Sequence, residues 1–457
     1  MGFIDFTFLF GFIFCLIFIG LYKSKKKVLE STYLVADRKT SLFSLVATLV
    51  MTEFNSATLI AFSSLGFLMG KKALFFPFIF LIGLLFYALT VAKKWKQFDG
   101  YSVAGFFTLK YGKSLGKIAS FLLILSMIGF TSSYVKSLSL LFSEIFPNIN
   151  FWLLSFIIVF LILLMCVKEG LVSIIRTDIF SFLLILIIFP MIFFFTMKAD
   201  VVSTANIDFS ESLFSYKFLI SLIILTMFTY ILAPWYGQKI FSAKDEKTAT
   251  LAVIFSAFFV FILYFLAVFT TYILRQKGYD LTNPERAYPL AISLMPKALK
   301  GLSFSLLFAT SATTLTGVYS AMNAMVVSDF LKHSKSAYSQ SVFRSKIITA
   351  SFALTSYILA NVLIDKIFDK IILANIPVAA LSFALLFGFY WKRTSKIGAY
   401  ISVIVGVLVG TFSYIIYKEE GMYTWYWATY GIVFIFVSGI MGSILFPDKK
   451  IKLVENF

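Results

Sequence analysis

The chain has 457 residues, of which 60% are hydrophobic and 19% aromatic. Charged residues make up 14%, whereas a soluble protein has about 25%. Apolar runs of about 20 residues, each long enough to cross a bilayer, recur along the whole length. This composition excludes a soluble globular protein. It predicts an all-α polytopic membrane protein that is embedded in the lipid bilayer. The net charge of +18 would suit a nucleic-acid partner, but the positions of the basic residues argue against one.

We expect thirteen transmembrane helices, with the N-terminus outside and the C-terminus in the cytoplasm. In chain order they lie at about 3–22, 43–70, 72–92, 116–145, 151–167, 174–197, 214–236, 248–274, 300–330, 344–363, 367–391, 396–417 and 424–446. The first run has no cleavage site after it, so we expect it to be a retained span rather than a signal peptide. In this topology the basic clusters at 23–27, 93–96 and 391–396 all face the cytoplasm. The basic charge therefore predicts orientation in the cytoplasmic (inner) membrane, not nucleic-acid binding.

The cysteines and the histidine do not suit an enzyme. His333 is the single histidine and lies in a basic connection, so no span carries a histidine for a catalytic triad or a metal site. Cys15 and Cys166 lie in apolar spans without the spacing of a disulfide or a metal site. We find no motif for an organic cofactor and no sign of an obligate protein partner. We therefore expect no enzymatic activity.

Two spans that are five apart carry polar interruptions. The first is TEFNSAT (52–58), and the second comprises Thr226, Thr229 and Tyr230, closed by Pro234 and Gly237. Many secondary transporters consist of two inverted repeats, each opening with a helix broken near the midplane. We therefore expect a single transporter domain whose core is a 5+5 inverted repeat. Its parts would be a peripheral first helix and loop at 1–42, repeats at 43–197 and 214–391, and peripheral last helices with a short tail at 396–457.

Six segments resemble motifs of the sodium/solute symporter family, in the order in which the family has them. They are YLVADRK (33–39), YSVAGFFTLKYGKSLGKIAS (101–120), EGLVSIIRTDIFSFLLIL (169–186), GQKIFSAKDEKTA (237–249), FATSATTLTGVYSAMNAMVVSDFLK (308–332) and FGFYWKRTSKIGA (387–399). The fourth matches a family loop only with a gap. The resemblance implies a LeuT-type fold and a sodium-coupled secondary symporter. Such a protein imports a small organic solute by alternating access, with Na⁺ as the coupling ion.

The resemblance also implies a first sodium site between the first and eighth core helices. Its ligands would be the backbone carbonyls of Met51, Phe54 and Thr310 and the hydroxyls of Thr313 and Thr314. Na⁺ is a hard cation that prefers oxygen, and interrupted helices supply neutral oxygens within a membrane. Threonines in a span also commonly bond to a carbonyl of their own helix, which would leave them with a purely structural role.

Some family members bind a second sodium ion through an aspartate on the fifth core helix. In this chain the resemblance implies Asp178 for that site, with Thr313 and Thr316. Gly317 stands where the family has a further hydroxyl, which is a departure. Two other interpretations stay open: Asp178 lines the cytoplasmic exit for cations, or it caps the start of a helix together with Arg176.

Polar residues near the interruptions are substrate candidates: Glu53, Asn55, Thr58, Lys136 and Thr229. Relatives that carry acidic sugars place an arginine on the helix of Lys136, so the resemblance implies that Lys136 holds a carboxylate. We therefore expect a carboxylate-bearing solute, either an amino acid or an organic acid. Glu53 would charge the sodium site or bind a substrate amine. Alternatively, Glu53 and Lys136 pair with each other, or Lys136 extends to the outer surface.

Two further functions stay open at this point. One is a proton-coupled carrier of the same fold, with Glu53 or Asp178 as the proton site. The other is a transport-deficient nutrient sensor, or a channel. The sequence does not name the solute, the number of sodium ions in a cycle or the oligomeric state.

Overall fold

A computed structural model describes residues 2–21, 35–98, 100–166, 171–203, 209, 215–331, 338–418 and 422–448. His333 and the basic cluster at 23–27 lie outside the described residues. Within the described part the regular elements are all helices, and one isolated β-bridge joins Thr40 to Ala243. The prediction of an all-α membrane protein is confirmed.

Nine of the described helices are long and apolar enough to cross a membrane. They are Phe3–Gly20, Ser56–Phe75, Phe78–Phe98, Lys113–Ser143, Leu171–Lys198, Glu246–Gln276, Leu299–Leu331, Lys396–Tyr417 and Tyr426–Leu445. The number rises to eleven if two bent helix pairs are each counted as one span. The many-span architecture is thus confirmed, whereas the count of thirteen stays a prediction.

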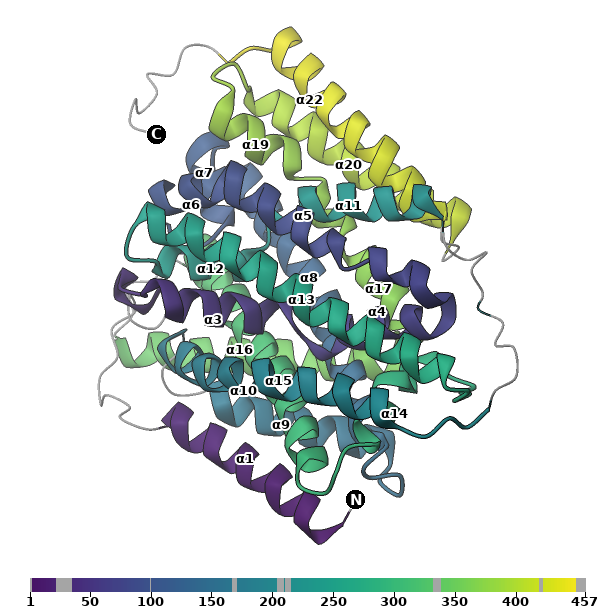
Figure 1. Ribbon diagram of the computed structural model, residues 1–457. Helices are drawn as coiled ribbons and strands as arrows, with labels where there is room; N and C mark the ends of the chain where they lie inside the picture. The colour runs from purple at the N-terminus through teal and green to yellow at the C-terminus, as the bar shows by residue number, and fades with distance from the viewer. Residues whose placement is uncertain are drawn as a thin grey trace.

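The α-helices of the described residues have the following bounds. They are α1 (Phe3–Leu21), α3 (Leu42–Glu53), α4 (Ser56–Met69), α5 (Phe78–Tyr87), α6 (Lys93–Phe98), α7 (Ala104–Tyr111), α8 (Lys113–Ser143), α9 (Phe151–Cys166), α10 (Leu171–Lys198), α11 (Tyr216–Tyr230), α12 (Pro234–Ser242), α13 (Glu246–Gln276), α14 (Ala287–Ser293), α15 (Leu299–Met325), α16 (Tyr338–Val362), α17 (Ile367–Ala374), α18 (Ile376–Ala379), α19 (Ser382–Tyr390), α20 (Lys396–Tyr417), α21 (Met422–Trp425) and α22 (Ile432–Leu445). Figure 1 shows α1 at one edge of the bundle and α20 beside α22 at the opposite edge. Between them lies α15, on which nearly every side chain is buried.

The second expected span is a broken helix. α3 ends at Glu53, Phe54 and Asn55 leave the helical conformation, and α4 starts at Ser56. The Asn55 side chain caps α4, because its Oδ1 accepts a hydrogen bond from the backbone N–H of Thr58 at 3.0 Å. Its Nδ2 donates to the carbonyl of Glu53 at 2.9 Å. Asparagine is among the preferred N-cap residues, so the local sequence accounts for the break.

The seventh expected span is broken too, with α11 and α12 meeting at a bend of 48°. Pro234 is the first residue of α12, a position where a missing N–H costs nothing. The carbonyl of Ile231, within the break, accepts a hydrogen bond from the Trp95 indole at 2.9 Å. Backbone hydrogen bonds through Thr40, to Ser242 at 2.9 Å and from Lys244 at 3.1 Å, join the start of α3 to the end of α12.

Helix α13 holds both halves of the first broken helix. The Tyr264 hydroxyl donates to the carbonyl of Glu53 at 2.8 Å, and the Thr271 hydroxyl donates to that of Ser63 at 2.7 Å. A side chain at Gly66 would begin 2.4 Å from the carbonyl oxygen of Val268, so this close approach of α4 to α13 requires glycine.

Candidate substrate and cation sites

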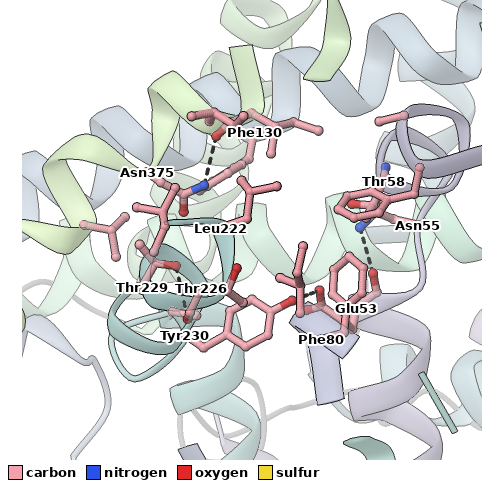
Figure 2. A pocket seen from close by; sticks show the side chains of 18 of the residues that line it. Glu53, Asn55, Thr58, Phe80, Phe130, Leu222, Thr226, Thr229, Tyr230 and Asn375 are labelled. Carbon is pink, nitrogen blue, oxygen red and sulfur yellow. Dashed lines mark hydrogen bonds between the residues drawn. The ribbon is translucent and has the colours of Figure 1, made fainter. Parts of the chain in front are cut away.

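A pocket lies between the two broken helices (Figure 2). Helices α5, α8, α17 and α18 complete its wall. Its polar lining residues are Glu53, Asn55, Thr58, Thr226, Thr229, Tyr230 and Asn375, and its other aromatic ones are Phe62, Phe80, Phe130, Tyr134 and Trp235. Among the described residues that line the pocket, Glu53 is the only charged one. The empty space is about 800 Å³, including space open to solvent.

Glu53 is held in place from both broken helices. Its carboxylate accepts a hydrogen bond from the hydroxyl of Tyr230 at the end of α11, and Figure 2 shows the two side chains meeting at the pocket. Its backbone carbonyl accepts from Asn55 and Tyr264. The side chain is 6% exposed, so the pocket presents a buried carboxylate surrounded by aromatic rings.

Four of the five expected substrate residues line this pocket: Glu53, Asn55, Thr58 and Thr229. Lys136 does not, because its ammonium lies 4.6 Å from the ring centroid of Phe151. Tyr134, two positions earlier on α8, does face the pocket, and residues two apart on a helix point in different directions. The alternative ion pair between Glu53 and Lys136 is also absent from the described part of the chain, where the carboxylate bonds to Tyr230.

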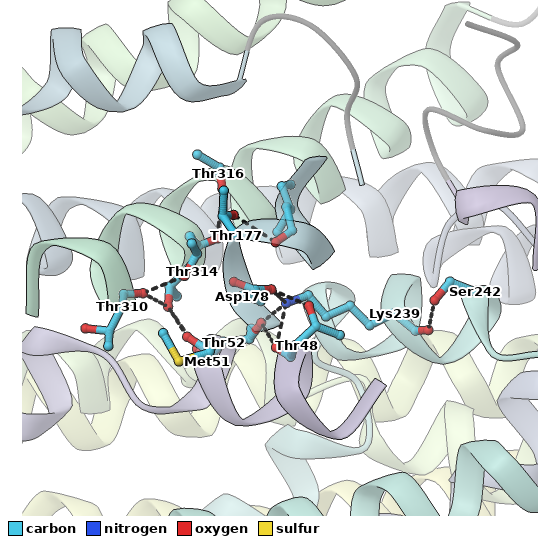
Figure 3. Close-up of polar contacts among 12 residues, drawn as sticks. Thr48, Met51, Thr52, Thr177, Asp178, Lys239, Ser242, Thr310, Thr314 and Thr316 are labelled. Carbon is cyan, nitrogen blue, oxygen red and sulfur yellow. Dashed lines mark hydrogen bonds and ion pairs between the residues drawn. The ribbon is translucent and has the colours of Figure 1, made fainter. Parts of the chain in front are cut away.

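The hydroxyl of Thr314 brings together carbonyl oxygens of α3 and α15 (Figure 3). Its Oγ1 lies 3.1 Å from the carbonyl oxygens of Met51 and Thr52 and 2.8 Å from that of Thr310. Carbonyls in the last turn of a helix lack a partner within the helix, so the break after Glu53 makes those of α3 available. We call Met51, Thr52, Thr310 and Thr314 the Thr314 cluster. It offers the neutral oxygens that a hard cation prefers.

The other threonines of α15 behave as threonines in a span commonly do. The hydroxyl of Thr313 donates to the carbonyl of Thr310 at 3.1 Å, and that of Thr316 to the carbonyl of Thr313 at 2.9 Å. The Phe54 ring packs between Phe189 and Tyr264. Of the five ligands expected for the first sodium site, the structure thus joins three in one cluster and adds Thr52.

Asp178 and Lys239 form a buried ion pair next to this cluster (Figure 3). The ammonium of Lys239 lies 3.3 Å from Oδ2 of Asp178, donates to the carbonyl of Thr48 at 2.7 Å and contacts the Thr52 hydroxyl. The Thr48 hydroxyl donates to the same carboxylate oxygen. Asp178 lies inside α10 and not at its start, so it does not cap that helix. The carboxylate expected to bind a second sodium ion has a lysine as its partner.

Sequence reasoning missed Lys239, because the seventh span was expected to end at 236 with a loop after it. The helix instead continues to Ser242, and every residue of α12 is buried. Pro234 carried a usable signal, since proline favours the first turn of a helix and not only its end. Thr52 was missed because a sequence does not show which carbonyl turns toward a neighbouring helix.

Comparisons with known proteins agree with this architecture. The model described as the sodium:solute symporter family matches residues 33–406. Sodium/myo-inositol cotransporter 2 of Rattus norvegicus is 26% identical over 139 residues, which cover 27% of this chain and only 20% of that relative's length.

Two solved structures show the fold. One is a Na⁺-coupled sialic acid symporter in a substrate-bound, outward-open state, with a TM-score of 0.83, 18% identity and coverage of 99% of this chain and 100% of the other. The second is Mhp1, a nucleobase-cation-symport-1 family transporter in a closed conformation with bromovinylhydantoin bound. Its TM-score is 0.58, at 13% identity and with 92% and 97% of the two chains covered. The predicted LeuT-type fold is confirmed.

Proposed function

Because this chain belongs to the sodium:solute symporter family, we propose that it imports a small organic solute together with Na⁺ by alternating access. The family and the structural neighbours are transporters, not enzymes. The observation that carries the proposal is the position of one pocket between two broken helices, with the Thr314 cluster at the end of α3. Transporters of this kind bind substrate and coupling ions at such breaks.

Sodium enters this proposal as a co-transported substrate. The Thr314 cluster contributes a hydroxyl and three carbonyls from two helices, all without net charge. We retain Phe54 and Thr313 as further ligands in the proposal, because Thr313 precedes Thr314 in the chain and Phe54 lies two residues after Thr52. A cation at this point would hold the free end of α3 against α15.

We propose that the solute is a zwitterion of the amino-acid type. Glu53 is the single charged group of the described lining, so it favours a substrate ammonium, and aromatic rings around it add cation–π attraction. The helix start at Asn55 and Thr58 would receive the carboxylate, because helix N-termini favour negative charge. This keeps the expected carboxylate but removes Lys136 as its holder. An organic acid without an amine would offer Glu53 no cationic partner and would be repelled by its carboxylate.

Coupling follows from the order of residues on α3. The carbonyls of Met51 and Thr52 belong to the Thr314 cluster, and the next residue is Glu53 at the pocket. Sodium bound at the cluster would fix the end of α3 and with it the direction of the carboxylate. A solute bound to Glu53 would in turn stabilise the sodium-binding arrangement, since coupling between two sites is reciprocal.

The test is uptake into proteoliposomes with and without an inward sodium gradient. The panel contains amino acids, their decarboxylated amines and their deaminated acids. We expect sodium-driven uptake of an amino acid, weaker uptake of the amine and none of the acid. Glu53→Gln should abolish uptake of the amino acid, whereas Lys96→Gln, outside the pocket lining, should leave it measurable. Uptake that ignores sodium would contradict the coupling, and uptake of the acid alone would contradict the zwitterion.

We also propose the expected orientation, with the N-terminus outside the cytoplasmic membrane and the C-terminus inside. It rests on the basic clusters at 93–96 and 391–396. After replacement of Cys15 and Cys166, a cysteine at the exposed Arg393 should react with an impermeant thiol reagent only from the cytoplasmic side. A cysteine at the exposed Lys297 should react only from outside. The reverse pattern would invert the topology.

A further inference from the structure

Lys239 is a buried cation that the substrate pocket does not use. It is 1% exposed and reaches three kinds of oxygen: the carbonyl of Thr48, the hydroxyl of Thr52 and the carboxylate of Asp178. Backbone carbonyls of broken helices coordinate Na⁺ in secondary transporters, and the hydroxyl and the carboxylate add further oxygens of the kind that hard cations prefer. The ammonium therefore occupies a position that is lined by the kind of oxygen atoms that surround a monovalent metal cation.

The charges at this position already balance. Asp178 is fully buried and Lys239 nearly so, and the ammonium lies 3.3 Å from the carboxylate. A buried charge needs a partner of opposite sign, and each of these two groups is that partner for the other. A sodium ion arriving at Asp178 would have to share this one carboxylate with the ammonium 3.3 Å away.

We propose that the ammonium of Lys239 takes the place of a second sodium ion beside Asp178, so that a single Na⁺ accompanies each solute molecule. The inference rests on the proposed sodium coupling. It replaces the expected second site at Asp178 and Thr316, where the resemblance implied a sodium ion.

The tethered cation and the proposed sodium ion would be close neighbours. Thr52 belongs to both surroundings, since its carbonyl faces Thr314 and its hydroxyl contacts Lys239. A sodium ion leaves the protein in every transport cycle, whereas a lysine stays on α12. The backbone hydrogen bonds of Thr40 keep that helix joined to α3. The fixed charge therefore stabilises the carboxylate without consuming a second ion.

The experiment measures how many sodium ions the purified full-length protein binds, by radioactive ²²Na⁺ at saturation, and how many enter with each solute in proteoliposomes. Wild type should bind one. Lys239→Gln exposes Asp178 to solution cations, so binding should rise to two and the Hill coefficient for sodium should approach 2. Lys239→Arg keeps the positive charge and should bind one. Lys96→Gln, which removes a lysine that donates to the Phe241 carbonyl at 3.3 Å, is the matched control and should also bind one.

Two sodium ions bound or transported by wild type would overturn the proposal. A folded Lys239→Gln protein that still binds one would also overturn it, because the ion pair would then be purely structural. Should Lys239→Gln not fold, the wild-type count and Lys239→Arg decide: one ion in both supports the tethered cation, and two in either rejects it. No sodium binding by wild type would instead reject the proposed sodium coupling itself.

Discussion

The Thr314 cluster and the Asp178–Lys239 pair are two oxygen-lined sites. Both include contacts to residues of α3, and the two sites differ in charge. The first contains a hydroxyl and three carbonyls, with no ionised side chain among its described members. The second contains a carboxylate and the ammonium that neutralises it. Oxygen donors alone therefore do not define an ion site in a membrane protein. The net charge of the donors decides whether an ion from solution is needed.

Removal of the Asp178 carboxylate should have the largest effect. Asp178→Asn leaves Lys239 buried without a counter-charge, which we expect to destabilise the protein by about 3–5 kcal/mol. Thermal unfolding in detergent measures the loss. The double variant Asp178→Asn/Lys239→Gln removes both charges and should recover most of it. An Asp178→Asn variant as stable as wild type would show that Asp178 and Lys239 do not form an ion pair in the protein.

A second test changes the Thr314 cluster, which carries no net charge. Thr314→Ala removes the hydroxyl that adjoins three carbonyls, and we expect the sodium concentration for half-maximal uptake to rise about tenfold, since an unsatisfied buried group costs about 1–3 kcal/mol. Thr314→Ser keeps the hydroxyl and should stay close to wild type. Equal sodium dependence in the alanine variant and wild type, at normal expression, would remove the cluster from the proposed function.

Sodium itself should stabilise the protein. At ten times its dissociation constant, a ligand that binds only the folded state adds about 1.4 kcal/mol. We therefore expect a higher melting temperature in NaCl than in KCl of the same ionic strength. The difference should persist in Lys96→Gln and vanish in Thr314→Ala. A difference that survives Thr314→Ala would place the sodium ion elsewhere.

The smallest effect is expected at the neighbouring threonine. Thr313→Ala deletes a hydroxyl that bonds to the carbonyl of Thr310 in its own helix, so the half-saturating sodium concentration should change by about threefold or less, the low end of the effect of one hydrogen bond. Sodium titration of uptake, next to Thr314→Ala, measures the contrast. An effect as large as that of Thr314→Ala would restore Thr313 as a ligand of equal weight.

The sequence was sufficient for the architecture and for the first break. Long apolar runs require helices in a bilayer, and TEFNSAT combines a preferred N-cap, Asn55, with hydroxyls that tolerate a break. The second break was expected too, but its far half was not, because Pro234 was taken as an end and not as a beginning. Because of this interpretation of Pro234, Lys239 was expected in a loop, and its ion pair with Asp178 was not predicted.

The remaining differences between prediction and structure concern where a side chain or a carbonyl points. Lys136 was expected at the pocket because relatives that carry acidic sugars place an arginine on this helix, but the helix turns Tyr134 toward the pocket and Lys136 toward Phe151. The phase of a helix is set by how it packs against its neighbours, and the polar residues of α8 are spread around its circumference, so its own sequence does not fix that phase. Likewise, the carbonyl of Thr52 joined the cluster through tertiary packing, which no local pattern reveals.

The glycine at position 66 bears on how the pocket opens. The Val268 carbonyl fills the space where a side chain would stand, and Thr271 and Tyr264 bond to Ser63 and Glu53 on either side of the break. The first broken helix is therefore joined to α13 at Glu53, Ser63 and Gly66, and we expect the two helices to move together. Exposure of the pocket to alternate sides of the membrane should then involve movement of the opposite wall, α8 with α17 and α18, relative to this pair.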